Sequence, residues 1–343
     1  MGDNIPFISI AIASYNYSRY LRRAIEIIKK SEFRDFEIVY CDDCSTDNSV
    51  EVINEIIKDN TDLKIRLIKN QTNLGILQTK TRLIYECTGK YIMICDADDY
   101  MDEHCLDKLV AVAKKTNADR IVSEVYDIEV REDGERKVIQ KQDIPKSTSK
   151  WLWNLNHGCL YKRDIFVNNH IELDFIPDDV CLTVYFSQFS KSVAWIRKPL
   201  YYWCVHEDSA GRKKDIKEKF NRLINDFALA VDKIDSVAEN YTDINKSDLE
   251  LLIVKLYYLQ IYHGLKKYSL KDKYKAYKKL KALMDNRRTG YLENYYIKHS
   301  GKMPLRKYAK IIVWFSTVLE RFHLMKAGLL GYHLLSKVLY FDQ

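Results

Sequence analysis

Two clusters of carboxylate residues stand where a metal ion or a nucleotide could bind. Asp42 and Asp43 follow one short apolar run, and Asp96, Asp98 and Asp99 follow another. So many carboxylates at one sheet edge repel one another unless a cation or hydrogen-bond donors offset their charge. Hard oxygen ligands suit Mg²⁺ or Mn²⁺, and substrate phosphates usually complete the coordination of such ions. The pattern therefore favours metal-assisted phosphate chemistry.

Helix capping is the alternative explanation of the second cluster. Asp99 or Asp102 is placed to cap a helix that begins near Glu103. For Asp98 alone, capping and metal binding explain the sequence equally well. The upstream Asp42-Asp43 pair favours the ligand role, because a cap would not require a second acidic cluster.

The segments before these carboxylates alternate between strand and helix patterns. Strands are predicted at 7–13, 36–41, 64–68 and 91–95, with amphipathic helices between them. Ser18 is predicted to cap the first helix, and residues 45–47 the second. Consecutive βα units of this length pack as a parallel sheet covered on both faces, and ligands bind at the carboxyl ends of its strands. Both acidic clusters are therefore expected at the binding edge.

Four ordered motifs resemble those of the inverting family 2 glycosyltransferases, which have the GT-A fold. They lie at residues 10–16, 42–47, 73–75 and 96–99, with looser similarity at 156–162, 177–179 and 206–212. A lone DxD motif is frequent by chance, but four motifs in order are specific. The resemblance implies an α/β protein, with a Rossmann-like, mostly parallel GT-A domain over residues 1–212. An α-helical region over residues 213–343 follows it.

The resemblance also implies the residues that bind a nucleotide-sugar donor, expected to be UDP-linked. Tyr15 can lie against the uracil face, and Asp43 resembles the carboxylate that accepts a hydrogen bond from uracil N3–H. Asp96 stands where the family contacts ribose, and Asp98 where it binds a metal ion, here Mn²⁺ or Mg²⁺. The implied donor-binding set is Ala13, Tyr15, Asp43, Lys80, Asp96, Ala97, Asp98 and Arg212.

The resemblance places the catalytic base at Asp179, at the start of a predicted helix. An inverting, in-line displacement uses such a carboxylate to take the acceptor proton. Asp178 is the alternative base, although it can instead cap the helix. His206 is either a further metal ligand or a structural histidine, and Arg212 can bind phosphate. Lys80 stands where the family commonly has Arg, so it keeps the charge but loses the bidentate fork.

The implied activity is inverting transfer of a hexosyl or N-acetylhexosaminyl group from a nucleotide sugar. The expected acceptor is a hydroxyl of a glycan or lipid-linked glycan in surface polysaccharide synthesis. A sugar nucleotidyltransferase is one alternative, but it needs a Gly-rich loop where residues 14–18 read SYNYS. A non-catalytic glycan-binding module is another, and the intact Asp43, Asp98 and Asp179 argue against it.

The C-terminal third differs from the rest in charge and pattern. Residues 1–212 hold 29 Lys/Arg against 34 Asp/Glu, whereas residues 213–343 hold 26 against 14. Helices are predicted near 215–238, 247–268, 271–285 and 302–340. A dense lysine run at 266–281 is either a solvated helix face or a contact for anionic lipid headgroups. A role in acceptor binding or homo-oligomer formation is the alternative, and no nucleic-acid partner is expected because no known binding motif accompanies the run.

The basic residues before the apolar stretch 311–322 also favour a membrane surface. No window is apolar enough to span a bilayer. The N-terminus lacks a secretory signal, so the expected location is cytoplasmic, with peripheral binding at the inner face of the cell membrane. The eight cysteines are expected to be reduced thiols. Trp151 and Trp153 are interpreted either as an acceptor-stacking pair or as part of a half-buried strand.

Overall fold

The computed structural model describes residues 5–130, 135–146, 149–153, 156–176, 178–205, 216–240, 245–264, 268–288 and 290–338. The chain divides into two compact units, one formed by residues 1–144 and 154–207 and the other by residues 145–153 and 208–343. The short segment 145–153 therefore belongs with the C-terminal helices. The predicted boundary at 212 lies outside the described residues.

The first unit is built on a mixed, mostly parallel sheet with the strand order β3-β2-β1-β4-β8-β6-β9-β5. The four predicted strands are confirmed as a parallel group, β1 (Ile8–Ser14), β2 (Phe36–Asp42), β3 (Lys64–Lys69) and β4 (Tyr91–Asp96). The rest of the sheet consists of β5 (Tyr100–Met101), β6 (Arg120–Val130), β7 (Arg136–Gln142), β8 (Cys159–Lys162) and β9 (Val193–Cys204). β8 is antiparallel to both β4 and β6, whereas β9 runs parallel to β6.

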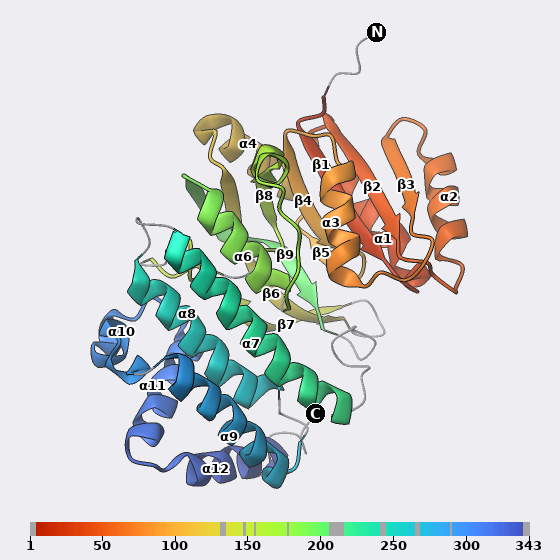
Figure 1. Ribbon diagram of the computed structural model, residues 1–343. Helices are drawn as coiled ribbons and strands as arrows, with labels where there is room; N and C mark the ends of the chain where they lie inside the picture. Colours follow the sequence, from red (N-terminus) through yellow and green to blue (C-terminus); the bar gives the residue numbers. More distant parts are fainter. Residues whose placement is uncertain are drawn as a thin grey trace. The chain divides into compact units, whose positions relative to one another are not determined.

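Helices cover both faces of this sheet. In Figure 1, α1 (Ser18–Ile28) and α2 (Ser49–Asp59) lie together on one face, and α3 (Ile76–Glu86) crosses β1 and β2 on the other. The apolar stripe predicted on the first helix is buried at Leu21, Ala24, Ile25 and Ile28. Three further helices complete the unit, α4 (Cys105–Thr116), α5 (Arg163–Asn168) and α6 (Asp178–Phe189). Burial of this apolar surface is the main force that holds the strand ends in place.

Two of the predicted caps are wrong. α1 begins at Ser18, but the oxygen that accepts the Ser18 N–H is Asp47 Oδ2, at 3.2 Å. Asp99 does not cap α4, because its Oδ1 accepts the N–H of Cys204 at 2.8 Å. Asp102 does bond the N–H of His104, just before α4. In the first two cases the competing partner comes from a segment distant in sequence, which local capping rules do not include.

The second unit is helical and packs around α8 (Lys246–Leu259), which continues as a π-helical turn over Gln260–Gly264. α8 is buried on almost every side and contacts α7 (Ile216–Asn240), α10 (Tyr295–Lys298) and α11 (Lys307–Arg321). α9 (Leu270–Arg287) and α12 (Met325–Val338) contact each other. Short 3₁₀ turns cover Tyr291–Glu293 and Ser300–Lys302. No helix among the described residues has the length and hydropathy needed to cross a bilayer.

The predicted last helix, 302–340, is wrong because the structure contains two helices there. α11 ends at Arg321, and His323 adopts a left-handed φ of 56°. The Leu324 N–H then bonds the Leu319 carbonyl at 2.7 Å, which closes the helix end before α12 begins. Apolar periodicity continues through this break, so the sequence pattern alone does not reveal it.

The burial of side chains tests three further predictions. All eight cysteines are free thiols, and all but Cys44 are buried. Trp151 and Trp153 are only 6% and 2% exposed and lie in no strand, so both interpretations of this pair are wrong. The lysine run of 266–281 is not one solvated face, because Lys273 is fully buried, with its Nζ 3.2 Å from His333 Nδ1. Lys266 and Lys267 lie outside the described residues.

Candidate functional site

The carboxyl ends of β2, β1 and β4 lie side by side at one edge of the sheet. Ala13 near the end of β1 is paired with Cys41 on one side and with Asp96 on the other. The Asp43 N–H bonds the Ser14 carbonyl at 2.8 Å, so the loop after β2 begins against the loop after β1. The two acidic clusters therefore meet at the same edge, as their spacing predicts.

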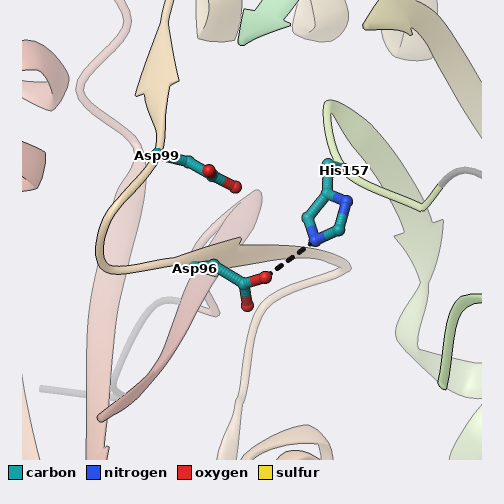
Figure 2. A group of neighbouring side chains, drawn as sticks. All are labelled: Asp96, Asp99 and His157. Carbon is teal, nitrogen blue, oxygen red and sulfur yellow. Dashed lines mark hydrogen bonds and ion pairs between the residues drawn. The ribbon is translucent and has the colours of Figure 1, made fainter. Parts of the chain in front are cut away.

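Asp96 is the centre of a polar network at this edge. Lys80, on α3, places its Nζ 3.3 Å from Asp96 Oδ1. His157, in the loop before β8, places Nε2 2.9 Å from Asp96 Oδ2 (Figure 2). The backbone N–H of Asp96 donates to the Tyr201 hydroxyl at 3.1 Å. The side chain of Lys80 is only 3% exposed, so the buried ammonium group has a carboxylate as its counter-charge.

The charged groups in this network stabilise one another's ionised forms. Burial by itself would raise the pKa of Asp96, but the positive charges of Lys80 and His157 hold that pKa well below its usual range. Burial by itself would lower the pKa of His157, but the charge of Asp96 and the hydrogen bond to it raise that pKa to about 9. At neutral pH the network therefore consists of one carboxylate between two cations.

Asp99 brings a second carboxylate to the same place, and Figure 2 shows it pointing toward the space beside Asp96 and His157. One ligand atom from each of the three residues lies within 4.8 Å of the others. Asp99 Oδ2 is buried and has no hydrogen-bond partner among the described residues. Burial raises the pKa of Asp99 well above its ordinary value, and the neighbouring acidic groups add to this. A divalent cation would offset that cost, and the carboxylate and imidazole donors suit Mn²⁺.

The position of His157 depends on its neighbours Gly158 and Tyr201. The imidazole stacks on the Tyr201 ring, with centroids 5.4 Å apart and an interplanar angle of 24°. Gly158 has a φ of +64°, and a Cβ there would lie 2.6 Å from Ser123 Oγ and 2.7 Å from Tyr201 Cβ. Only glycine fits this position, since both the backbone angle and the space exclude a side chain.

Asp43 organises a loop in the structure. Its Oδ1 accepts the Leu74 N–H at 2.8 Å and Asn70 Nδ2 at 2.7 Å, and its Oδ2 accepts the Gly75 N–H at 2.9 Å. Gly75, with a φ of 83°, directly precedes α3, which carries Lys80. Asp43 therefore anchors the start of the helix that supplies the cation to Asp96. Its contact with uracil stays a prediction.

Asp179 lies at the start of α6, and Asn156 connects it to the His157 loop. Asn156 Nδ2 donates to the Asp179 backbone carbonyl at 2.5 Å. Asn156 Oδ1 in turn accepts the Tyr161 hydroxyl at 2.6 Å. The chain at the predicted base is therefore tied to the residue beside His157, and the assignment of Asp179 as the base stays a prediction.

The other predicted site residues differ in their exposure and in their contacts. Tyr15 follows β1 and is 43% exposed, whereas Ala97 and Asp98 are buried. Arg23 donates to the backbone carbonyl of Asp98. The group of ligand atoms contains Asp96 and Asp99 but not Asp98. His206 and Arg212 lie outside the described residues, so their predicted roles stay predictions.

The sequence motifs do not identify His157 as a member of this group. Asp99 belongs to the predicted acidic cluster, with helix capping as the alternative, whereas His157 is only part of the loosely similar segment 156–162. One signal was available, because a histidine directly before a glycine and a short apolar run suggests a turn that places the ring at a strand start. Nothing in the sequence indicated that β8 would pair with β4 and bring this turn to Asp96.

Comparison with known proteins gives the same assignment as the motifs. Residues 9–176 match the sequence model of the family described as Glycosyl transferase family 2. This segment is a family 2 glycosyltransferase domain. The chain is 25% identical over 246 residues to the glycosyltransferase GlyG of Streptococcus pneumoniae serotype 4, a match that covers 65% of this chain and 81% of GlyG. It is 32% identical over 124 residues to the hyaluronan synthase of Pasteurella multocida, covering 34% of this chain and 12% of the synthase.

Solved structures share the fold. S. aureus TarS 1–349 in complex with UDP-GlcNAc matches with a TM-score of 0.64 and 16% identity, covering 89% of this chain and 90% of TarS. The Pyrobaculum calidifontis mannosyltransferase PcManGT, in complex with GDP-Man and Mn²⁺, matches with a TM-score of 0.55 and 13% identity, covering 93% of this chain and 88% of PcManGT. The α/β GT-A architecture of the glycosyltransferase domain, followed by C-terminal helices, is thus confirmed.

Proposed function

We propose that this glycosyltransferase transfers a hexosyl or N-acetylhexosaminyl group, with inversion, from a UDP-sugar to a glycan or lipid-linked glycan hydroxyl. The observation that carries the proposal is the meeting of Asp96, Asp99 and His157 at one sheet edge, next to Asn156, which bonds the Asp179 carbonyl. The similar structures were solved with UDP-GlcNAc or GDP-Man, which supports a nucleotide-sugar donor.

Each predicted site residue has its own role in this reaction. Tyr15 stacks on the base and Asp43 accepts its N–H, while Ala13, Lys80, Asp96, Ala97, Asp98 and Arg212 bind the rest of the donor. Asp179 takes the proton of the acceptor hydroxyl as that oxygen bonds to the anomeric carbon. The bond from the anomeric carbon to phosphate oxygen breaks on the opposite face, and the electron pair leaves with the nucleoside diphosphate.

A divalent ion, Mn²⁺ or Mg²⁺, fits the acidic loop at residues 96–99. Asp96, Asp99 and His157 would hold it, whereas the family resemblance favours Asp98 and His206. When bound, the ion offsets the charge that builds on the leaving diphosphate. His157 must lose its proton to serve as a ligand, so ion binding and proton release are linked.

We also place the enzyme in surface polysaccharide synthesis, in the cytoplasm and peripheral to the inner face of the membrane. The relatives support this, because they include a polysaccharide synthase. A lipid-linked acceptor would be presented at that surface. Homo-oligomer formation through the C-terminal helices is the alternative role for the second unit.

The test uses the full chain with Mn²⁺ and a panel of nucleotide sugars. A donor that binds the native state raises the melting temperature by an amount that grows with affinity. We expect a UDP-sugar to stabilise the protein and nucleoside diphosphate to be released faster when an acceptor is added. Formation of pyrophosphate from a nucleoside triphosphate and a sugar phosphate would identify a nucleotidyltransferase instead. Donor binding without any release would identify a binding module.

A further inference from the structure

The second unit exposes an apolar stripe on α11. Ile311, Trp314 and Phe315 are 53%, 48% and 47% exposed. Phe322 and Leu324, just past the helix, are 68% and 51% exposed. Monomeric proteins seldom leave so many large apolar side chains together in water without an interaction partner.

Helical geometry separates this stripe from the face that packs in the unit. At 100° per residue, Ile311, Trp314, Phe315 and Phe322 fall on one side of the helix. The residues that α11 buries fall on the opposite side: Ala309, Val313, Ser316, Thr317 and Glu320. α11 therefore buries one face in the unit and leaves an apolar stripe exposed on the opposite face.

The charge around the stripe identifies the partner chemistry. Residues 302–338 contain seven Lys or Arg and a single acidic residue, Glu320. Glu320 is only 5% exposed and accepts the hydroxyl of Tyr257, so it points into the unit. Apart from Glu320, every charged residue of this segment is basic, and an apolar strip with such neighbours matches a surface that offers both hydrocarbon and negative charge. A second copy of the chain is a poorer match, because it would set two basic surfaces against each other.

We propose that the α11 stripe inserts into the headgroup region of an anionic bilayer. The stripe is formed by Ile311, Trp314, Phe315, Phe322 and Leu324. The basic residues close to it in sequence, Lys302, Lys307, Lys310, Arg321 and Lys326, would contact lipid phosphates. This proposal specifies which surface would bind the membrane named in the proposed function. It depends on the proposed function only for which membrane is bound. It also moves the contact from the lysine run on α9 to α11, since Lys273 in that run is buried.

The test measures binding of the full chain to vesicles without donor or acceptor. Vesicles of phosphatidylcholine with phosphatidylglycerol should bind at low salt, and vesicles of phosphatidylcholine alone should bind much more weakly. Trp314→Ser with Phe315→Ser should reduce partitioning about tenfold or more, because two large side chains no longer leave water. The matched control is Val138→Ser with Ile139→Ser, on β7, where the side chains are 44% and 50% exposed. This control should bind as the wild type does.

A second measurement locates the contact directly. Brominated lipids quench tryptophan fluorescence at short range, so wild-type protein should be quenched on vesicles. Trp314→Phe should retain binding but lose most of that quenching. Normal folding of every variant is checked by its melting temperature and by the donor-induced shift, which must persist. Donor binding without vesicle binding would overturn this proposal alone.

Two other outcomes would also overturn it. If Lys271→Gln with Lys275→Gln and Lys278→Gln abolishes vesicle binding while Trp314→Ser with Phe315→Ser does not, the contact lies on α9. If sedimentation shows a dimer that the Trp314→Ser and Phe315→Ser changes dissociate, and vesicles do not bind, the stripe is covered by a second copy.

Discussion

Lys80 Nζ lies 3.3 Å from Asp96 Oδ1, which makes a largely buried helix residue the counter-ion of the carboxylate at the end of β4. The other oxygen of the same carboxylate is bonded by His157. An aspartate held from both sides has a fixed orientation, and the candidate site is preorganised to that extent.

The first prediction concerns this pair. Lys80→Met should lower the free energy of unfolding by roughly 1–3 kcal/mol, because it removes one of the two cations that flank the partly buried Asp96 carboxylate. Asp96→Asn in the Lys80→Met background should recover part of that loss. A double-mutant cycle by urea unfolding should give a coupling energy of about 1 kcal/mol or more. Additive effects of the two substitutions would contradict a direct pair.

The second prediction separates the two descriptions of the metal site. Asp99→Asn should weaken Mn²⁺ binding about tenfold or more, measured by titration calorimetry with and without UDP. Asp98→Asn is the matched variant, one residue away and also buried. If Asp98→Asn alone abolishes Mn²⁺-dependent UDP binding while Asp99→Asn binds normally, the ligand set of the family resemblance is right and the Asp96–Asp99–His157 group is not. Removal of the ion with a chelator should abolish turnover in wild-type protein.

The third prediction concerns the base. Asp179→Asn should leave the affinity for donor unchanged while lowering kcat about a hundredfold or more, the usual contribution of a general base. Donor affinity is measured by the thermal shift and turnover by diphosphate release with saturating acceptor. Asp178→Asn is the control and should keep a near-normal rate. The reverse result would assign the base to Asp178.

The fourth prediction concerns pH and the second unit. Burial raises the pKa of Glu320 above its ordinary value of 4.5, and hydrogen bonds from Tyr257 and Tyr291 lower it only in part. The folded state thus holds this proton more tightly than the unfolded state. Its contribution to stability is complete below pH 4.5 and declines as pH rises toward the folded pKa.

Glu320→Gln, which cannot titrate, should therefore flatten the decline of stability above that pH. Urea midpoints between about pH 4 and pH 8 would measure the effect. Glu293→Gln is a suitable control, because Glu293 is exposed and its pKa is lowered by Lys298. A Glu320→Gln profile parallel to wild type would show that this carboxyl does not contribute.

Much of the fold was predictable because its first half obeys local rules. The parallel strands, their helices and the meeting of both acidic clusters follow from periodicity and from the topology of βα units. The site was less predictable because its partners are non-local. Asp99 bonds Cys204 rather than a helix end, and His157 reaches Asp96 only because β8 joins the sheet beside β4. In the second unit, burial of Lys273 could not be predicted, since a lysine run usually indicates solvent.

Gly158 makes the candidate site sensitive to a residue that carries no functional group. Its positive φ and the contacts that a Cβ would make with Ser123 and Tyr201 mean that the turn exists only while this position has no side chain. Homologous chains can therefore be sorted by the residue that follows the histidine. A relative with any other residue after the histidine must send its backbone along a different path there, and its imidazole should no longer reach the carboxylate. In such a relative another residue would have to supply the second cation, or the orientation of the aspartate side chain would be less fixed.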